Sequence, residues 1–504
     1  MKVNEESLHR IDTHWAVSAI GEGERDRVLK MADVFLVKSA VGEQVKIDFA
    51  ESPQHWAKLE RLALAYEMAA IEGLNAILNP LPDKETDRLR EQCFSAAWRT
   101  FELRRLLPIP KGIEERIFHI IHLSCLAYCG DRWSDLRRWY SEKEKELLAP
   151  TIADAPWDRR LLYRLYECWF CLFRKKSWGD LHRIHEIIAG LRQDQKNYES
   201  EVLNNGNSDA DRVMALRLIA LYHWAKATEL LALYILQGEP LDIVTQLDKH
   251  FESAYEAAAI SRDSQMEILT RWLHAASRRM AAGSVWWVAS KVNSRVTQFI
   301  RNVTRQRALF ELLPPQRAAL QEQGLLDQAT EAVVIELPTS GGKTLLAQFK
   351  ILQALNQFDA DRGWVAYVTP TRALTAQITR RLRRDFSPLG ITVEQLTGAV
   401  EIDSFEEILL AGEKAQKTFD ILVATPEKLQ LVIRNKKVSR PLALVVMDEA
   451  HNIGNDTRGL RIELMLATIK RECRSANFLL LMPYVENAAR LTQWLSPEAG
   501  RTIG

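Results

Sequence analysis

The sequence predicts an irregular, solenoid-like array of α-helices followed by a domain built on a parallel α/β sheet. Between about residues 54 and 300, apolar residues recur at three- and four-residue spacing, as on one face of a helix. After about residue 313, short apolar runs alternate with helical segments. With 504 residues, the chain is also too long for a single core. We expect a small N-terminal segment at 1–53, a repeat-like helical domain at 54–300 and the α/β domain at 301–504.

The helical pattern is clearest from Ser208 to Pro240. Ser208 can cap the start of a helix there, and Gly238 and Pro240 end it. Short turns between such segments predict antiparallel helix pairs, which bury their apolar faces by stacking on one another. The stretch from Ala220 to Met280 is similar to tetratricopeptide-type pairs but keeps no regular repeat. We therefore predict an irregular array.

The N-terminal segment has a different pattern. Apolar and β-branched residues gather at 34–37 and 45–49, on either side of Gly42. Two such runs around a glycine predict a small β-hairpin.

The helical part is rich in tryptophan and cysteine. Twelve of the fourteen tryptophans precede residue 300. They could form an aromatic platform for bases, but tryptophan at helical spacing usually fills gaps between helices, and we favour that interpretation. Cys125 with Cys129 and Cys168 with Cys171 could bind a metal or an iron–sulfur cluster. Leucine and aromatic neighbours favour packing of these thiols in the core instead.

The overall charge and hydropathy exclude some partners. A formal net charge of +1 gives no global attraction to nucleic acid, so such binding requires a local basic patch. Apolar runs long enough to cross a membrane are missing, and the first residues lack the pattern of a signal peptide. We expect a cytoplasmic protein that does not enter membranes.

The α/β part contains five short apolar runs that predict strands. Helical segments at 344–355 and 373–386 alternate with several of them. Continuous apolar strands indicate a parallel sheet covered on both faces, whose ligand lies at the carboxyl ends of the strands. The predicted strands lie at 333–335, 365–368, 421–423, 444–446 and 478–481.

A glycine-containing loop between the first strand and the first helix is typical of a phosphate-binding loop. Gly341 and Gly342 let backbone N–H groups approach a triphosphate, and the helix N-terminus adds favourable partial charge. Lys343 is expected to reach the β- and γ-phosphates, and Thr344 to bind Mg²⁺. Leu337 replaces the usual leading glycine, and a purely structural Gly-Gly turn is the alternative. The predicted nucleotide-binding residues of the loop are Thr339, Ser340, Gly341, Gly342, Lys343 and Thr344.

Two adjacent carboxylates end the fourth predicted strand. Asp448 is expected to hold Mg²⁺, and Glu449 to orient and deprotonate the attacking water. With Lys343 they form the predicted catalytic set. An exposed acidic helix start is the alternative for this pair alone.

These motifs resemble those of the DEAD/DEAH-box helicases of superfamily 2, in particular the branch of archaeal DNA-repair and exosome-associated RNA helicases. The resemblance covers about residues 313 to 495 and implies a RecA-like domain that uses ATP and Mg²⁺. It implies that Gln316 reads adenine. It further implies contacts with a nucleic acid, which could be DNA or RNA. A single charged residue such as Arg372 is more often a solvated surface residue, which is the alternative for each residue taken alone. The implied nucleic-acid residues are Thr371, Arg372, Thr397, Gly398, Thr425 and Pro426.

The sequence departs from this family in two places. Met482, Pro483 and Tyr484 replace the family's Ser-Ala-Thr element, so that only the Tyr484 phenol remains to act beside His451 in coupling hydrolysis to movement. The sequence also ends at Gly504, where the first RecA-like domain should finish. We expect the N-terminal part of a longer motor, or a second chain that supplies the other half with its arginine fingers.

The resemblance predicts an ATP-dependent helicase or translocase whose helical region recruits a protein partner or gates the substrate, in a setting such as bacterial defence or repair. A second hypothesis is a helical scaffold whose ATP-binding domain acts as a switch without unwinding. A third makes the helical region a nucleic-acid clamp.

Overall fold

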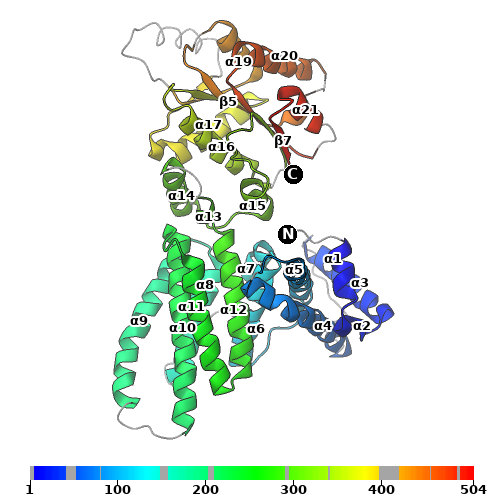
Figure 1. Ribbon diagram of the computed structural model, residues 1–504, viewed down its shortest axis with the longest axis vertical. Helices are drawn as coiled ribbons and strands as arrows, with labels where there is room; N and C mark the ends of the chain where they lie inside the picture. Colours follow the sequence, from blue (N-terminus) through cyan, green and yellow to red (C-terminus); the bar gives the residue numbers. More distant parts are fainter. Residues whose placement is uncertain are drawn as a thin grey trace. The chain divides into compact units, whose positions relative to one another are not determined.

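The computed structural model describes residues 5–40, 53–79, 81–147, 157–202, 209–289, 294–338, 341–396, 419–436, 438–453, 456–484 and 488–504. The chain divides into two compact units, Met1–Ala282 and Gly283–Gly504 (Figure 1). Among the described residues, the regular elements of the first unit are helices, and the second unit contains the sheet.

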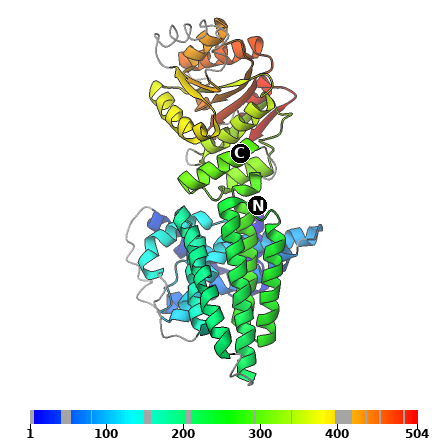
Figure 2. The ribbon, with the colours of Figure 1, turned by 90° about the vertical axis from the view of Figure 1, so that its left-hand side faces the viewer.

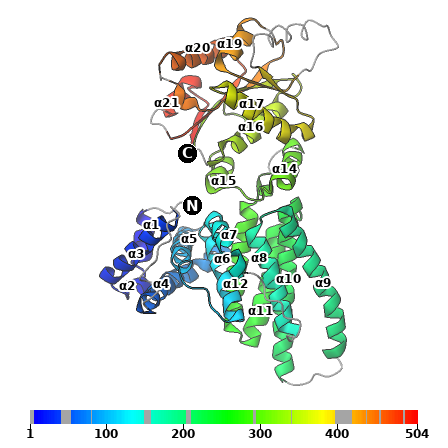
Figure 3. The same cartoon turned by 180° about the vertical axis from the view of Figure 1, so that it is seen from behind.

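The helical unit is an array of helices of unequal length. Neighbours in the sequence pack side by side, most extensively α4 on α5 and α10 on α11, and the long helices α9, α10 and α11 are adjacent (Figure 3). Among the described residues of the whole chain, no helix is long and apolar enough to cross a membrane. The helices are α1 (Glu5–Asp12), α2 (Trp15–Ser18), α3 (Glu22–Ala40), α4 (Pro53–Leu78), α5 (Lys84–Arg104), α6 (Ile113–Cys129), α7 (Trp133–Leu147), α8 (Trp157–Arg174), α9 (Trp178–Val202), α10 (Asp209–Gln237), α11 (Ile243–Ser261) and α12 (Ser264–Gly283).

Large aromatic residues and thiols fill the spaces between these helices. Trp169, Trp224 and Trp272 are fully buried, and the Trp224 indole N–H donates to the Thr270 hydroxyl at 3.0 Å. The five cysteines of this unit are buried and free, and burial raises the pKa of each thiol. No group of metal-binding side chains gathers in the part of the chain that the structure describes. Packing is therefore confirmed for these tryptophans and cysteines.

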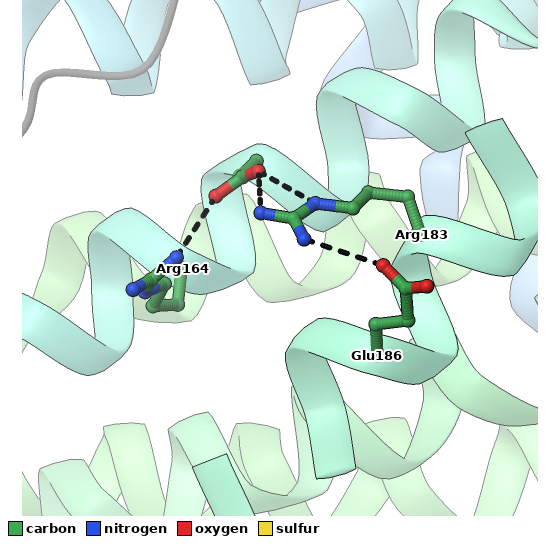
Figure 4. A network of polar contacts seen from close by, with 4 residues as sticks. Arg164, Arg183 and Glu186 are labelled. Atoms are coloured by element: carbon green, nitrogen blue, oxygen red, sulfur yellow. Dashed lines mark hydrogen bonds and ion pairs between the residues drawn. The ribbon is translucent and has the colours of Figure 1, made fainter. Parts of the chain in front are cut away.

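Two networks of polar contacts join helices in this unit. The Arg183 guanidinium on α9 bonds to Glu167 on α8 at 3.2 Å and to Glu186 at 3.3 Å, while Arg164 also reaches Glu167 (Figure 4). This network is exposed, so it orients the helices more than it stabilises them. The second is buried: Glu67 on α4 accepts from Arg104 on α5 and lies 3.0 Å from the His122 ring nitrogen on α6.

The predicted N-terminal hairpin is wrong in its described half. Residues 34–37 lie within α3, whose charged and helix-favouring neighbours continue the helix through this short β-type run. Residues 45–49 lie outside the described residues. The units also divide after Ala282, so α14 (Ser294–Arg307), which the boundary predicted at residue 300 would cut, belongs whole to the second unit.

The second unit is a seven-stranded sheet with helices on both faces (Figure 2). The strand order is β3-β4-β2-β5-β6-β1-β7, and every pairing is parallel. All five predicted strands are confirmed. The strands are β1 (Ala332–Glu336), β2 (Trp364–Val368), β3 (Val393–Leu396), β4 (Ile421–Ala424), β5 (Leu442–Met447), β6 (Asn477–Met482) and β7 (Gly500–Ile503). The helices are α13 (Trp286–Ala289), α14, α15 (Pro314–Gln321), α16 (Lys343–Gln357), α17 (Arg372–Phe386), α19 (Pro426–Arg434), α20 (Asp456–Glu472) and α21 (Ala488–Leu495), with 3₁₀ turns η3 (Ser387–Leu389) and η5 (Ala450–Asn452).

A buried carboxylate fixes α14 to the helices that cover one face of the sheet. Asp385, at the end of α17, accepts from Arg307 on α14 at 3.0 Å and from the Gln348 amide on α16 at 2.9 Å. The Phe299 ring packs against the rings of Phe349 and Phe386 beside it. Since a buried charge must be paired, these contacts define where α14 lies.

We predict that Glu67→Gln lowers the free energy of unfolding by about 3 kcal/mol at pH 7, because it leaves Arg104 without its buried counter-charge. Burial raises the pKa of Glu67, but His122 and Arg104 outweigh it and lower that pKa to about 2. The stabilisation is therefore complete above about pH 4.5 and is lost as the pH falls toward 2.

Urea unfolding followed by tryptophan fluorescence measures the difference between variant and wild type at each pH. Glu186→Gln, which removes an exposed partner, is the matched control and should cost less than about 1 kcal/mol. A difference for Glu67→Gln that persists unchanged at pH 3 contradicts this account.

Candidate functional site

The loop between β1 and α16 has the backbone of a phosphate-binding turn. Gly342 has a φ of 72°, a left-handed conformation that favours glycine, and the Gly341 N–H donates to the Pro338 carbonyl at 2.8 Å. The Lys343 ammonium is buried in the curve of the loop and donates to the Leu337 carbonyl at 2.9 Å. Thr344 follows on the first turn of α16 and is half-buried. Thr339 and Ser340 lie outside the described residues.

Gln316 lies directly against this loop. Its amide N–H₂ group reaches the carbonyls of Gly341 and Gly342 at 3.4 and 3.3 Å, and its amide oxygen accepts from the Leu313 N–H at 2.9 Å. The side chain is buried, and it ties the start of α15 to the loop. The residue predicted to read adenine is therefore brought to the phosphate loop.

The carboxylate pair follows β5 at the same edge of the sheet. The Asp448 N–H donates to the Val368 carbonyl at 2.9 Å, which continues the pairing of β5 with β2. Burial and the neighbouring Glu449 raise the pKa of Asp448, while the Lys343 ammonium acts in the opposite direction. The loop after β1 and the carboxylates after β5 both lie at the carboxyl edge of the parallel sheet, where α16 packs on β5.

Glu449 holds an unusual backbone conformation. Its φ of 52° is left-handed, which costs a residue other than glycine about 1–2 kcal/mol. Its side chain is one-third exposed, and a carboxylate oxygen lies 3.2 Å from Nδ1 of His451. The strained turn thus directs Glu449 away from the strand and toward the histidine predicted to act in coupling.

The residues predicted to bind nucleic acid are placed unevenly. Thr371 and Arg372 are exposed after β2, where the Thr371 hydroxyl caps α17 by accepting from the Leu374 N–H at 3.3 Å. Thr425 and Pro426 follow β4, the neighbouring strand, but are buried at the start of α19. Thr397 and Gly398 lie outside the described residues.

A tyrosine other than the predicted one contacts the carboxylate pair. The Tyr484 side chain is 85% exposed and makes no hydrogen bond to a described residue. Instead, the hydroxyl of Tyr367 on β2 donates to Asp448 at 3.2 Å. Tyr367 was not among the predicted site residues, although a tyrosine inside a fully apolar strand signals a hydroxyl that needs a buried partner.

The sequence pattern of the family described as DEAD/DEAH box helicase matches residues 314–482. The C-terminal half of the chain contains a DEAD/DEAH box helicase domain. This helicase domain is RecA-like, with the helix-rich region before it.

Several curated proteins are similar to the helicase domain. The ATP-dependent DNA helicase Hel308 of Pyrococcus abyssi is 31% identical over 208 residues, which are 41% of this chain and 26% of that protein. Hel308 of Methanocella arvoryzae is 35% identical over 190 residues, 37% of this chain and 24% of that protein. The chain thus spans about a quarter of the length of these relatives. The crystal structure of the DUF1998 helicase MrfA bound to DNA and AMPPNP is 21% identical, covers 42% of this chain and 29% of MrfA, and has a TM-score of 0.34.

Similarity to a further protein extends beyond the helicase domain. Hachiman protein HamB of Bacillus cereus is 23% identical over 334 residues, which are 65% of this chain and 28% of HamB. Because that alignment is longer than the whole unit Gly283–Gly504, it reaches into the helical unit.

We predict that Gly342→Ala weakens ATP binding about tenfold or more. At this left-handed φ, alanine costs about 1–2 kcal/mol more than glycine, and its Cβ would also clash with the Gln316 amide. Titration calorimetry with ATP and Mg²⁺ measures the affinities.

Gly390→Ala is the matched control, because Gly390 has the same φ of 72° but open space where the Cβ would lie. It should bind ATP as wild type does. Wild-type affinity in Gly342→Ala would show that the loop does not hold the nucleotide.

Proposed function

We propose that this chain is the helical region and first motor domain of an ATP-dependent nucleic-acid helicase or translocase. The observation that carries the proposal is that the loop with Lys343 and the strand end with Asp448 lie at the same carboxyl edge of the parallel sheet. A cation on a glycine turn and a carboxylate facing it are the two halves of a site for a triphosphate and its magnesium ion.

Each residue has a chemical task in this proposal. Lys343 binds the β- and γ-phosphates, and Glu449 orients the attacking water and takes up its proton. The half-buried Thr344 hydroxyl and the Asp448 carboxylate are oxygen ligands of the kind that Mg²⁺ prefers, so they would hold the ion. The bound ion would neutralise charge on the phosphates.

Nucleic acid, DNA or RNA, is the proposed substrate of movement. Thr371 and Arg372 are exposed at the carboxyl ends of the sheet, as contacts to phosphates require. Thr425 and Pro426 are proposed to contact the same nucleic acid through their backbone. Thr397 and Gly398 are proposed as further contacts to it. The contact of His451 with Glu449 is our candidate link between hydrolysis and movement.

The helical unit is proposed to recruit a protein partner or to gate the substrate. The alignment with HamB extends from the helicase domain into the helical unit. This supports a role of the helical unit that the two proteins share. We also propose that the protein acts in the cytoplasm, in bacterial defence or in DNA repair.

A scaffold with an ATP-binding switch is the second candidate. The exposure of Tyr484 favours it, because the replaced Ser-Ala-Thr element offers no hydroxyl to the carboxylate pair. The two candidates differ in turnover: a motor hydrolyses ATP faster when nucleic acid is bound, whereas a switch binds ATP with negligible hydrolysis.

We predict that single-stranded DNA or RNA stimulates ATP hydrolysis by the longest native product that contains this chain. Lys343→Ala and Glu449→Gln should each lower the stimulated rate at least about 100-fold, because one loses phosphate binding and the other the water-activating base. Release of inorganic phosphate is the measurement.

Lys196→Ala, which removes an exposed lysine of the helical unit, controls for loss of charge and should keep the full rate. ATP binding without turnover, with or without nucleic acid, would reject the motor and support the switch.

A further inference from the structure

A fully buried tyrosine lies behind the carboxylate pair. Tyr367 is the fourth residue of β2, and its register partner on β5 is Val446, two residues before Asp448. Its hydroxyl donates to one carboxylate oxygen of Asp448, Oδ2, at 3.2 Å. Asp448 is its hydrogen-bond partner among the described residues, and a phenol beside a carboxylate is the donor.

The other carboxylate oxygen of Asp448 is also occupied. Oδ1 accepts from the backbone N–H of Glu449 at 3.0 Å, and the Asp448 N–H is bonded to Val368. One donor on each oxygen, with the backbone anchored to β2, fixes the plane of the carboxylate. Each carboxylate oxygen keeps a second lone pair, so the group can still accept one metal ion or metal-bound water.

We propose that Tyr367 is a positioning residue that holds the Asp448 carboxylate in the orientation in which it receives Mg²⁺. This inference rests on the proposed function, because it assigns a role within the same nucleotide site. Groups that hydrogen-bond to a metal-ligating carboxylate typically change metal affinity 10- to 100-fold when removed. Tyr367 meets that description through a single, buried contact.

The arrangement also restricts the kind of ion. A carboxylate whose two oxygens each hold a donor cannot turn to grip a cation with both oxygens. Single-oxygen contact in a fixed direction suits octahedral Mg²⁺, whereas Ca²⁺ accepts two-oxygen contact and looser geometry. Removal of the tyrosine hydroxyl should therefore weaken the binding of Mg²⁺ more than it weakens the binding of Ca²⁺.

The test compares ATP affinity with Mg²⁺ and with EDTA, measured by calorimetry on the full chain. Tyr367→Phe keeps the ring that fills the core and removes only the hydroxyl. We expect its affinity for ATP in EDTA to equal that of wild type, while the gain in affinity from Mg²⁺ falls about 10-fold. The gain in affinity from Ca²⁺ should fall less than the gain from Mg²⁺.

Two further variants complete the experiment. Asp448→Asn should abolish the Mg²⁺-dependent gain, and adding Tyr367→Phe to it should change nothing more, since both act through one ligand. Tyr140→Phe is the matched control, because Tyr140 is a fully buried tyrosine of the helical unit whose hydroxyl contacts Ser124 at 2.6 Å. Its Mg²⁺-dependent gain should match that of wild type.

Two outcomes overturn this inference but leave the proposed function standing. One is a full Mg²⁺-dependent gain in Tyr367→Phe, and the other is an equal loss of affinity in Mg²⁺ and in EDTA, which indicates general damage to the fold. If wild-type protein binds ATP in neither condition, the proposed function itself fails and this inference falls with it.

Discussion

The parallel pairing of all seven strands is the constraint on which the helicase domain depends. Because β1, β5 and β2 point the same way, the loop that follows β1 and the carboxylates that follow β5 come to one edge, although β6 separates the two strands. The carbonyl of Val368 then receives the Asp448 N–H and continues the β2–β5 ladder into the site. A reversal of any of these three strands would move its motif to the opposite edge.

Much of this arrangement follows from the sequence, because central strands are buried on both faces and show as continuous apolar runs. β3 and β7 were not predicted. Each is an edge strand of four residues that includes polar side chains, as in Val393–Leu396, so neither forms an apolar run. The boundary between the helical array and the α/β domain was also predicted too late, at residue 300, since α14 has the same amphipathic pattern as the array before it but is fixed to the second unit by Asp385.

The two tyrosines illustrate a limit of a different kind. Tyr484 stands where the family's hydroxyl residues stand and was predicted to act in coupling, whereas Tyr367 lies far from Asp448 in the sequence. Which tyrosine reaches Asp448 depends on strand register: β2 and β5 place Tyr367 beside Val446, and the chain after β6 leaves Tyr484 exposed. Register between strands that are distant in sequence leaves no mark in local composition. The Glu449 turn likewise has no signal in a motif made of ordinary residues.

The anchoring of α14 has a mechanical consequence. The chain that leaves the helical unit enters the second unit through α13 and α14, and the Arg307–Asp385 contact joins α14 to the last residues of α17. Tension along this connection would therefore be borne by a charged pair behind the sheet and by the Phe299 ring cluster. Because Gln348 and Phe349 of α16 contact the same pair and ring cluster, such a load would be passed to the helix that begins at Lys343, directly after the glycine turn.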